Sequence, residues 1–209
     1  MNILIVDDHA VIHQGLRRIL DDEFERATFG DACDSQQALD LVARERWDVV
    51  ILDVNLPGRG GLDVLRQMRA EHPNLPVVMF SIHLEEQFAI RALKAGASGY
   101  VAKDSSSAQL VEAIRKVIHG GTYVTPALAE KMAADLGRTG SAEPHDLLSD
   151  REFEVMRMIA AGKTTTEIAD QLSLSVKTVS TYRTRALEKL QLQTTSELIH
   201  YAIDHGLDR

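Results

Sequence analysis

Four short apolar runs in the first half of the chain each end at polar side chains, and this pattern constrains the fold more than any other feature. They are Ile3–Val6 before Asp7 and Asp8, Val49–Leu52 before Asp53, Val77–Phe80 before Ser81, and Gly99–Ala102 before Lys103. In an open parallel sheet, the carboxyl ends of the strands converge on one crevice, where ligands bind. Carboxylates crowded into such a crevice repel one another, so the pattern predicts a bound cation. Mg2+ is the natural choice, because it is a hard ion that takes oxygen ligands.

Amphipathic stretches alternate with these runs, and a weaker run near Ala27–Asp31 completes a set of five strands. The predicted helices are Ala10–Leu20, Ser35–Glu45, Gly61–Glu71, Glu85–Ala95 and Ser106–His119. Five strand–helix units predict a parallel sheet with helices on both faces. Pro57 and Gly58 predict a turn after Asp53, and Gly96 predicts the end of the fourth helix.

The chain divides into three parts by texture. Residues 1–120 carry the strand–helix pattern, and residues 121–146 have a linker composition in which Pro126–Leu136 predicts a short helix. Residues 147–209 show no strand signal and predict an all-α domain of four helices. Its helix starts are marked by capping boxes at Ser149 with Glu152, Thr164 with Glu167 and Thr194 with Glu197, and by a cap at Ser175. Short turns between these helices predict a helix-turn-helix domain.

The helix from Ser175 to Leu190 is predicted to bury one stripe and expose another. The buried stripe comprises Val176, Val179, Ala186, Leu187 and Leu190. The exposed stripe comprises Lys177, Thr178, Thr181, Tyr182, Arg185 and Lys189, with Ser180, Arg183 and Thr184 at its margins. Lysine and arginine can contact phosphates or guanine edges, and threonine can contact a thymine methyl group, so the exposed stripe predicts binding to double-stranded DNA.

Composition agrees with a cytoplasmic protein. The net charge is -8, but basic residues crowd this one helix. No apolar run is long enough to span a membrane, and the N-terminus lacks the basic region of a signal peptide. The single cysteine, Cys33, excludes an internal disulfide. His9, His13 and His83 have the wrong spacing for a zinc site, so they are interpreted as surface or rim residues.

The crevice residues predict transfer of a phosphoryl group to a carboxylate. Asp53 is the nucleophile candidate, because the turn after it leaves it beside the crevice. Asp8 is assigned as a direct Mg2+ ligand and Asp7 as a ligand or water-mediated partner, while Asn55 adds its backbone carbonyl. Lys103 would supply a second positive charge, and Ser81 would hydrogen-bond the product phosphoryl group.

The ordered set of Asp7, Asp8, Asp53, Ser81 and Lys103 resembles the receiver domain of two-component response regulators. The segment from Leu148–Glu152 through Gly162, followed by Ile168-Ala169 and Ser175–Val179, resembles the LuxR-type DNA-binding domain. Nearly the whole chain is therefore similar to the NarL/FixJ family. This resemblance implies a flavodoxin-like receiver, phosphorylation by a sensor histidine kinase, and control of transcription. Tyr100 matches an aromatic position that changes rotamer on activation in that family, turning inward as the phosphoryl group draws in Ser81. Asp104 departs from the proline that many receivers carry after the lysine.

Further expectations concern assembly, and two other functions stay open. The modest charge of one recognition helix predicts a homodimer on inverted-repeat sites, and RNA polymerase is a further candidate partner. Leu198 and Ala202 of the last helix would form the dimer surface or, alternatively, pack in the core of their own domain. A stand-alone metal-dependent phosphohydrolase is one other function, although it leaves the helical domain without a role. A DNA-binding protein with a vestigial receiver is the second, although the acidic set is complete.

Overall fold

The computed structural model describes residues 1–56, 59–81, 86–137 and 143–207. These residues form two compact units, Met1–Gly137 and Arg138–Arg209. The predicted turn at Pro57 and Gly58, and His83, lie outside the described residues. Within the described part of the chain, no helix is both long and apolar enough to cross a lipid bilayer.

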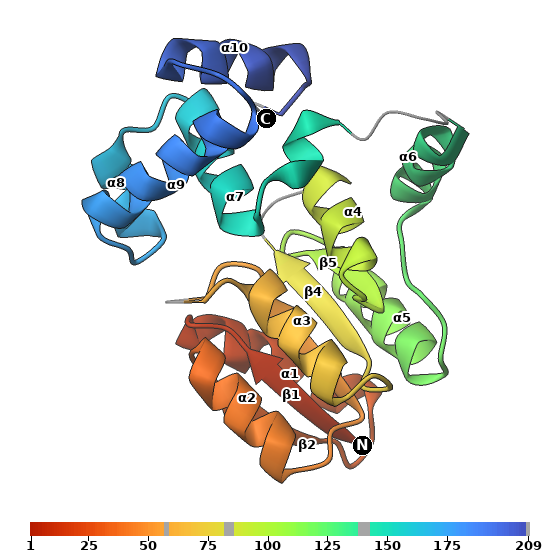
Figure 1. The fold of residues 1–209 in the computed structure, drawn as a ribbon. Helices are drawn as coiled ribbons and strands as arrows, with labels where there is room; N and C mark the ends of the chain where they lie inside the picture. The colour runs from red at the N-terminus through yellow and green to blue at the C-terminus, as the bar shows by residue number, and fades with distance from the viewer. Residues whose placement is uncertain (57–58, 82–85, 138–142, 208–209) are drawn as a thin grey trace. The chain divides into compact units, whose positions relative to one another are not determined.

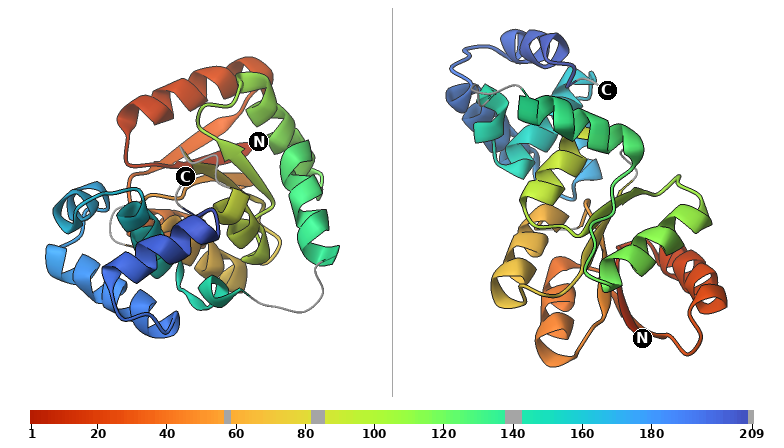
Figure 2. Two further views of the ribbon diagram at one scale, coloured as in Figure 1. Left: turned by 90° about the horizontal axis from the view of Figure 1, so that it is seen from above. Right: turned by 90° about the vertical axis from the view of Figure 1, so that its right-hand side faces the viewer.

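The first unit is a five-stranded parallel sheet with the strand order β2-β1-β3-β4-β5 (Figures 1 and 2). The strands are β1 (Asn2–Val6), β2 (Thr28–Ala32), β3 (Val49–Asp53), β4 (Val77–Ser81) and β5 (Gly99–Ala102). The helices are α1 (Ala10–Glu23), α2 (Ser35–Arg44), α3 (Gly61–Glu71), α4 (Glu86–Lys94), α5 (Ser107–Ile118) and α6 (Pro126–Gly137). The flavodoxin-like fold predicted from the sequence is therefore confirmed. Element ends differ slightly, since α1 continues past its predicted end at Leu20 and β2 begins one residue later than predicted.

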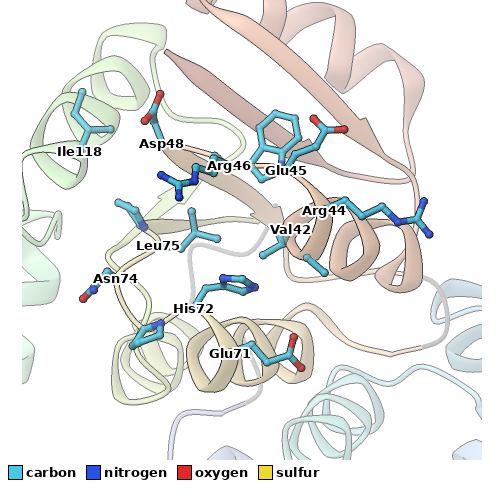
Figure 3. Close-up of a pocket in the computed structure, with 14 residues that line it drawn as sticks. Val42, Arg44, Glu45, Arg46, Asp48, Glu71, His72, Asn74, Leu75 and Ile118 are labelled. Atoms are coloured by element: carbon cyan, nitrogen blue, oxygen red, sulfur yellow. The ribbon is translucent and has the colours of Figure 1, made fainter.

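The order of the strands creates a switch point between β1 and β3, because β2 lies on one side of β1 and β3 on the other. Chains leaving β1 and β3 therefore diverge, and their carboxyl ends open a crevice between them. At the opposite, amino end of the sheet, a hollow of about 810 Å3 lies between the loops that follow α2 and α3. Figure 3 shows Val42 and Arg44 on one side of it and Glu71 and His72 on the other.

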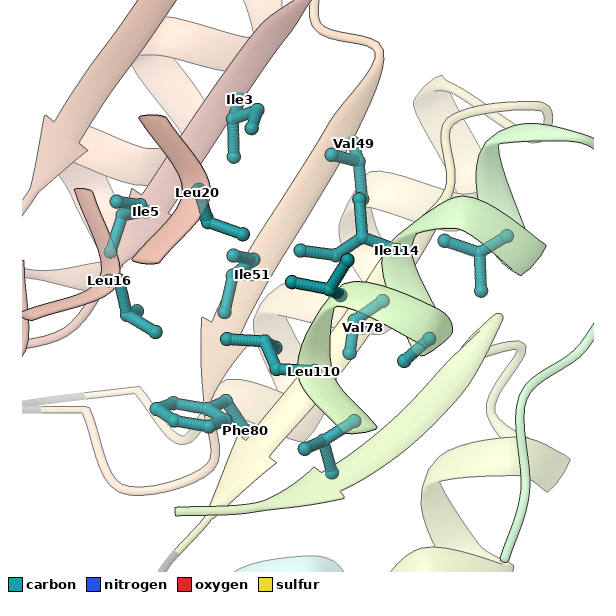
Figure 4. Close-up of a cluster of buried hydrophobic side chains, with 14 of the residues drawn as sticks. Ile3, Ile5, Leu16, Leu20, Val49, Ile51, Val78, Phe80, Leu110 and Ile114 are labelled. Atoms are coloured by element: carbon teal, nitrogen blue, oxygen red, sulfur yellow. The ribbon is translucent and has the colours of Figure 1, made fainter. Parts of the chain in front are cut away.

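Both faces of the sheet are buried, which explains the uninterrupted apolar runs. Alternate side chains of a strand point to opposite faces. On one face, Ile3, Ile5 and Ile51 pack against Leu16 of α1 and Leu110 of α5 (Figure 4). α2 and α3 lie side by side on the other face.

Several loops depend on particular backbone conformations. Gly96 follows α4 with a φ of 100°, which confirms the predicted glycine at the end of that helix.

After α5, the chain continues into α6, which packs against α4 within the first unit. Part of the predicted linker segment is thus helical, and α6 matches the short helix expected there.

The second unit contains the four predicted helices, preceded by a short 3-10 helix, Pro144–Leu147. They are α7 (Asp150–Ala160), α8 (Thr165–Gln171), α9 (Val176–Lys189) and α10 (Thr195–Asp204). The capping boxes at Ser149 and Thr164 and the cap at Ser175 are confirmed.

The third capping box is only half formed, which corrects the prediction. Thr194 accepts a hydrogen bond from the Glu197 N–H at 3.2 Å, but the Glu197 carboxylate accepts from the Gln193 N–H at 2.7 Å. Thr194 has a φ of -128°, whereas Ser149 and Thr164 have -63° and -75°. With this more extended backbone, the Glu197 carboxylate makes its short hydrogen bond to the Gln193 N–H, one residue before the expected donor.

Candidate functional site

Carboxylates gather at the carboxyl ends of β1 and β3, where the switch point opens the crevice. Asp7 follows β1 directly and Asp53 is the last residue of β3. Asp7 and Asp53 are each only 1% exposed, whereas Asp8 is exposed. One ligand atom from each of Asp7, Asp8, His9 and Asp53 lies within 4.8 Å of the others. The structure thus brings together the three acidic residues that the sequence assigned to a metal site.

Lys103 is the cation of this crevice. It follows β5, and its Nζ lies 2.5 Å from Asp7 Oδ2 and 3.0 Å from Asp53 Oδ2. Burial alone would lower the pKa of Lys103, but the Asp53 and Asp7 carboxylates outweigh burial and raise it. The lysine therefore remains a charged ammonium, and the three carboxylates still outnumber it.

The Asp53 carboxylate is the one in the crevice whose hydrogen bonding is least complete. Burial raises its pKa, Lys103 lowers it and the Asp7 charge raises it again, with a net upward shift. Among the described residues, neither Asp53 oxygen completes a well-formed hydrogen bond, although Lys103 and the Asn55 backbone lie close enough to favour the charged form. Such buried, poorly bonded oxygens are suited to a hard cation or to an incoming electrophile.

Asp7 differs from Asp53, because both of its oxygens have donors. Oδ1 accepts from the His9 backbone N–H at 2.9 Å, and Oδ2 accepts from Lys103. Asn55, whose backbone carbonyl the sequence assigned to the metal, lies two residues after Asp53, and its side-chain oxygen is buried without a hydrogen-bond partner among the described residues. Asp53 and the exposed Asp8, whose Oδ1 lies 2.7 Å from His9 Nδ1, are therefore the carboxylates most open to a cation.

The loop after Asp53 is packed tightly against α3. Gly61 donates its backbone N–H to the Val54 carbonyl at 2.9 Å. A Cβ atom at Gly61 would lie 2.0 Å from the carbonyl oxygen of Asp53. Only glycine allows α3 to begin this close to the backbone of the candidate nucleophile.

Ser81 and Tyr100 lie on the adjacent strands β4 and β5 and are hydrogen-bonded to each other. Ser81 is fully buried, and Tyr100 is 6% exposed. Burial raises the pKa of Tyr100 to about 12, against a smaller opposite effect of the Ser81 hydrogen bond. In this structure Tyr100 is already buried beside Ser81, whereas the resemblance to receiver domains implies that this inward orientation follows phosphorylation. A hollow of about 520 Å3 adjoins Tyr100, with Leu128 of α6 in its wall.

The recognition surface predicted in the second unit lies on α9. Lys177, Thr181 and Arg185 are exposed, while Thr178, Ser180 and Tyr182 are half-buried. Thr184, which the sequence placed at the margin, is also exposed. Thr181 and Thr184 donate their hydroxyls to the Lys177 and Ser180 carbonyls at 3.0 Å, so they present methyl groups and oxygen lone pairs outward.

The structure corrects one prediction about the apolar residues of this unit and decides between two alternatives for another. Val176 was expected to be buried, but it is 44% exposed, because it lies in the first turn of α9 at the margin of the buried stripe. Leu198 and Ala202 are fully buried in the second unit. Of the two roles left open for them, the structure supports packing in the core of their own domain.

The histidines were interpreted as rim residues, and this is wrong for His13. His9 is exposed, but His13 is 7% exposed. Its spacing with Leu16 and Leu20, the other buried residues of α1, was the available signal. Sequence reasoning therefore missed a buried polar residue directly behind the acidic crevice.

Family models match both parts of the chain. The Response regulator receiver domain matches residues 3–115, and the Bacterial regulatory proteins, luxR family, model matches residues 146–202. The chain is 36% identical to Response regulator UvrY of Escherichia coli (strain K12) over 208 residues, covering 99% of this chain and 95% of that protein. It is 38% identical to Response regulator GacA of Pseudomonas syringae pv. syringae (strain B728a) over 208 residues, covering 99% of this chain and 97% of that protein.

Solved structures show the same similarity. RcsB from Salmonella enterica serovar Typhimurium, bound to promoter rprA in the presence of the phosphomimetic BeF3-, superposes with a TM-score of 0.65 and 26% identity, covering 96% of this chain and 97% of that chain. A LuxR-family two-component response regulator from Aurantimonas sp. SI85-9A1 superposes with a TM-score of 0.61 and 34% identity, covering 66% of this chain and 98% of that chain.

Proposed function

The chain belongs to the NarL/FixJ family of two-component response regulators, and on this premise we propose that Asp53 is the residue that accepts the phosphoryl group. It is a transcription regulator with a receiver domain and a LuxR-type DNA-binding domain. The observation that carries the proposal is the buried Asp53 carboxylate at the end of β3, with Lys103 Nζ 3.0 Å away and no well-formed hydrogen bond among the described residues.

The transfer follows from the charges of the crevice. An oxygen of Asp53 attacks the phosphorus of a phosphohistidine on a sensor kinase, or of a small phosphodonor. An O–P bond forms while the bond from phosphorus to the donor breaks. Lys103 balances negative charge on the phosphoryl oxygens and holds Asp7 in place. The receiver catalyses only this step and the slow hydrolysis of its own product.

Mg2+ is the cofactor that fits these residues. The carboxylates of Asp8 and Asp53 and the backbone carbonyl of Asn55 would hold it, with Asp7 as a further ligand or through water. When bound, it would neutralise charge on the transferring phosphoryl group. The buried oxygens of Asp53 and the excess of carboxylates over cations support this assignment.

Ser81 and Tyr100 would connect the phosphoryl group to the surface formed by α4, β5 and α5. Ser81 would donate to the phosphoryl oxygens, and its movement toward them would open the space in which Tyr100 takes its inward position. Because Leu128 of α6 lines the hollow beside Tyr100, a change of the Tyr100 rotamer would alter the packing of α6.

DNA would be read by α9 through Lys177, Thr178, Ser180, Thr181, Tyr182, Arg185 and Lys189. The protein has a net charge of -8, so non-specific attraction to DNA adds little. We therefore infer a homodimer, formed on activation in the cytoplasm, with two α9 helices on inverted half-sites. RNA polymerase would be a further partner.

Residues 1–120 would form the receiver domain, residues 121–146 the linker that includes α6, and residues 147–209 the DNA-binding domain.

Intact-mass measurement tests the phosphoacceptor. The full chain, incubated with Mg2+ and a small acyl phosphate, should gain one phosphoryl group, and Asp53→Asn should gain none. Asp63→Asn, a partly exposed position on α3, serves as the matched control and should gain one group. Equal phosphorylation of Asp53→Asn would contradict the assignment.

The two other functions give different results in the same experiment. A phosphohydrolase would turn over a generic phosphate ester repeatedly, whereas a receiver takes up about one group per chain. A vestigial receiver would take up none, yet the chain would still select DNA from a random pool. Selection with and without the phosphodonor therefore tests DNA binding and its control together.

A further inference from the structure

His13 is a buried side chain of α1 that joins the acidic crevice to the neighbouring strand β2. Its Nε2 lies 2.7 Å from the backbone carbonyl oxygen of Asp7, and its Nδ1 lies 2.8 Å from Asp31 Oδ1. Both contacts are made to oxygens that only accept hydrogen bonds. The imidazole thus bridges the residue that begins the acidic crevice and a residue outside it.

Asp31 is held firmly from its other side. Arg17, one turn after His13 on α1, donates Nη2 to Asp31 Oδ2 at 2.5 Å. Burial would raise the pKa of Asp31, but the hydrogen bonds from Arg17 and His13 outweigh it and lower that pKa. The carboxylate therefore stays charged and anchors the imidazole. Asp31 also pairs in register with Ile5 of β1, so the anchor belongs to the sheet itself.

The bond to the Asp7 carbonyl acts on Asp8, because one peptide group joins the two residues. That peptide is planar, so holding its oxygen fixes the plane from which the chain continues to Asp8. The N–H of Asp7 is fixed in turn, since it donates to the Ala32 carbonyl at 3.0 Å. The Asp7 carboxylate is held by the His9 N–H. Within this turn, His13 is the side chain that secures the Asp7–Asp8 peptide.

We propose that His13 is a positioning residue for the cation site. The hydrogen bond from its Nε2 to the Asp7 backbone carbonyl holds the Asp8 carboxylate where it binds Mg2+. This inference rests on the proposed function, in which Asp8 and Asp53 hold the Mg2+ that assists transfer of a phosphoryl group to Asp53. His13 touches neither the cation nor the phosphoryl group. It acts only through the orientation of the Asp7–Asp8 peptide.

Two substitutions separate the two bonds of the ring. The amide nitrogen of glutamine can replace Nε2, whereas that of asparagine can replace only Nδ1. His13→Gln therefore keeps a donor for the Asp7 carbonyl and loses the bond to Asp31. His13→Asn keeps the bond to Asp31 and loses the one to Asp7. Each variant loses one hydrogen bond, so their urea midpoints should be similar.

Calorimetric titration of the full chain with Mg2+ is the first measurement. His13→Asn should bind Mg2+ about tenfold more weakly, which is the effect of one lost hydrogen bond on orientation. His13→Gln should stay within about twofold of the unsubstituted chain. Phosphorylation of Asp53 by an acyl phosphate should recover in His13→Asn at saturating Mg2+, so the change appears in the Mg2+ dependence and not in the maximal rate.

A second readout needs no metal. Hydrogen exchange at the backbone amides of Asp8 and His9 should accelerate in apo His13→Asn and stay slow in His13→Gln. If His13→Asn does not fold, Asp31→Asn provides another variant, because it weakens the anchor and leaves the imidazole in place. It should weaken Mg2+ binding by about threefold.

The outcomes are distinct. Equal Mg2+ affinity in His13→Asn and His13→Gln, at equal stability, would overturn the positioning role while phosphorylation of Asp53 stands. Unchanged affinity in Asp31→Asn would likewise count against it. If the unsubstituted chain binds no Mg2+ and Asp8→Ala behaves identically, both the inference and the proposed cofactor fail.

Discussion

The ammonium of Lys189, near the end of α9, lies 2.6 Å from the buried carboxylate of Glu152 in the first turn of α7. The same Glu152 oxygen accepts the Ser149 N–H at 2.8 Å, and Lys189 also reaches the Leu147 carbonyl at 3.2 Å. Lys189 thus connects the recognition helix to the capping box that opens the domain. The sequence assigned this lysine to DNA alone, and the structure adds a role within the domain.

Lys189→Ala should therefore destabilise the second unit. Solvent screens the partly exposed lysine, so we expect a loss of about 1 kcal/mol in the free energy of unfolding. Burial opposes ionisation of Glu152, but hydrogen bonds from Lys189 and Ser149 lower its pKa. The contribution is thus present above the ordinary glutamate pKa of about 4.3 and is lost as the pH falls through the lower folded-state value. Urea unfolding at several pH values measures this, and an equal loss at all pH values would contradict it.

Lys177→Ala is the matched control on the same helix. Lys177 is exposed, so its removal should leave stability unchanged. It should weaken DNA binding across all sequences and reduce the salt dependence by about one phosphate contact. Affinity measured at a series of salt concentrations shows the slope. Substitutions at Thr181 or Tyr182 should instead change which sequence is preferred.

Asp53→Asn should stabilise the apo protein at neutral pH, on the order of 1 kcal/mol, because it removes a buried charge from a crowded set. Burial raises the folded-state pKa of Asp53, so ionisation of this group costs stability as the pH rises through that pKa. The advantage of the variant should shrink as the pH is lowered. Thermal unfolding at several pH values tests this, and Asp63→Asn should show no comparable gain.

Asp8→Ala should reduce Mg2+ affinity more than Asp7→Ala. Both oxygens of Asp7 already have donors, His9 N–H and Lys103 Nζ, whereas Asp8 is exposed beside Asp53. Calorimetric titration with Mg2+ gives the comparison. Unchanged affinity in Asp8→Ala would remove it from the ligand set.

Ser81→Ala should still be phosphorylated, but phosphorylation should raise its DNA affinity only weakly. The Ser81 hydrogen bond lowers the pKa of Tyr100, which burial raises to about 12. Tyrosinate absorbance should show a titration at high pH that belongs to Tyr100 in the unsubstituted chain. This titration should move to higher pH in Ser81→Ala and should be missing in Tyr100→Phe. A full gain in DNA affinity by Ser81→Ala on phosphorylation would contradict the coupling.

Ile203→Glu should weaken cooperative DNA binding without unfolding the domain. Leu198 and Ala202 of α10 are buried, but Ile203 is 49% exposed and offers an apolar contact to a second copy. Binding stoichiometry on an inverted repeat, compared with a single half-site, measures cooperativity. Leu198→Ala is the contrasting variant and should lower the unfolding midpoint. Equal affinity with one protein per duplex on both sites would exclude the cooperative dimer.

The sequence predicted the sheet well, because β1, β3, β4 and β5 are buried on both faces and are therefore nearly continuous apolar runs, whereas β2 is partly exposed and gave the weaker signal. The crevice was equally predictable, since strand ends bring Asp7, Asp53 and Lys103 together once the sheet is parallel. The capping boxes at Ser149 and Thr164 were found because they depend on local spacing alone.

What the sequence did not reveal depends on contacts distant along the chain. His13 is polar and was placed at the rim, yet it packs beneath the crevice because Asp31, 18 residues away, supplies a carboxylate for it. Lys189 reaches Glu152, 37 residues away, and no periodicity within α9 indicates that partner. Val176 fits the apolar spacing of its helix, but it is the first residue of α9 and is 44% exposed at the margin of the buried stripe.

Gly61 has a consequence for how this receiver tolerates change. The start of α3 touches the backbone behind Asp53 so closely that even a methyl group would meet a carbonyl oxygen at 2.0 Å. A randomised library at this position, selected for phosphate uptake, should return glycine alone. Part of the reactive centre is thus encoded by a residue with no chemical group to offer, and a survey of reactive side chains would pass over it.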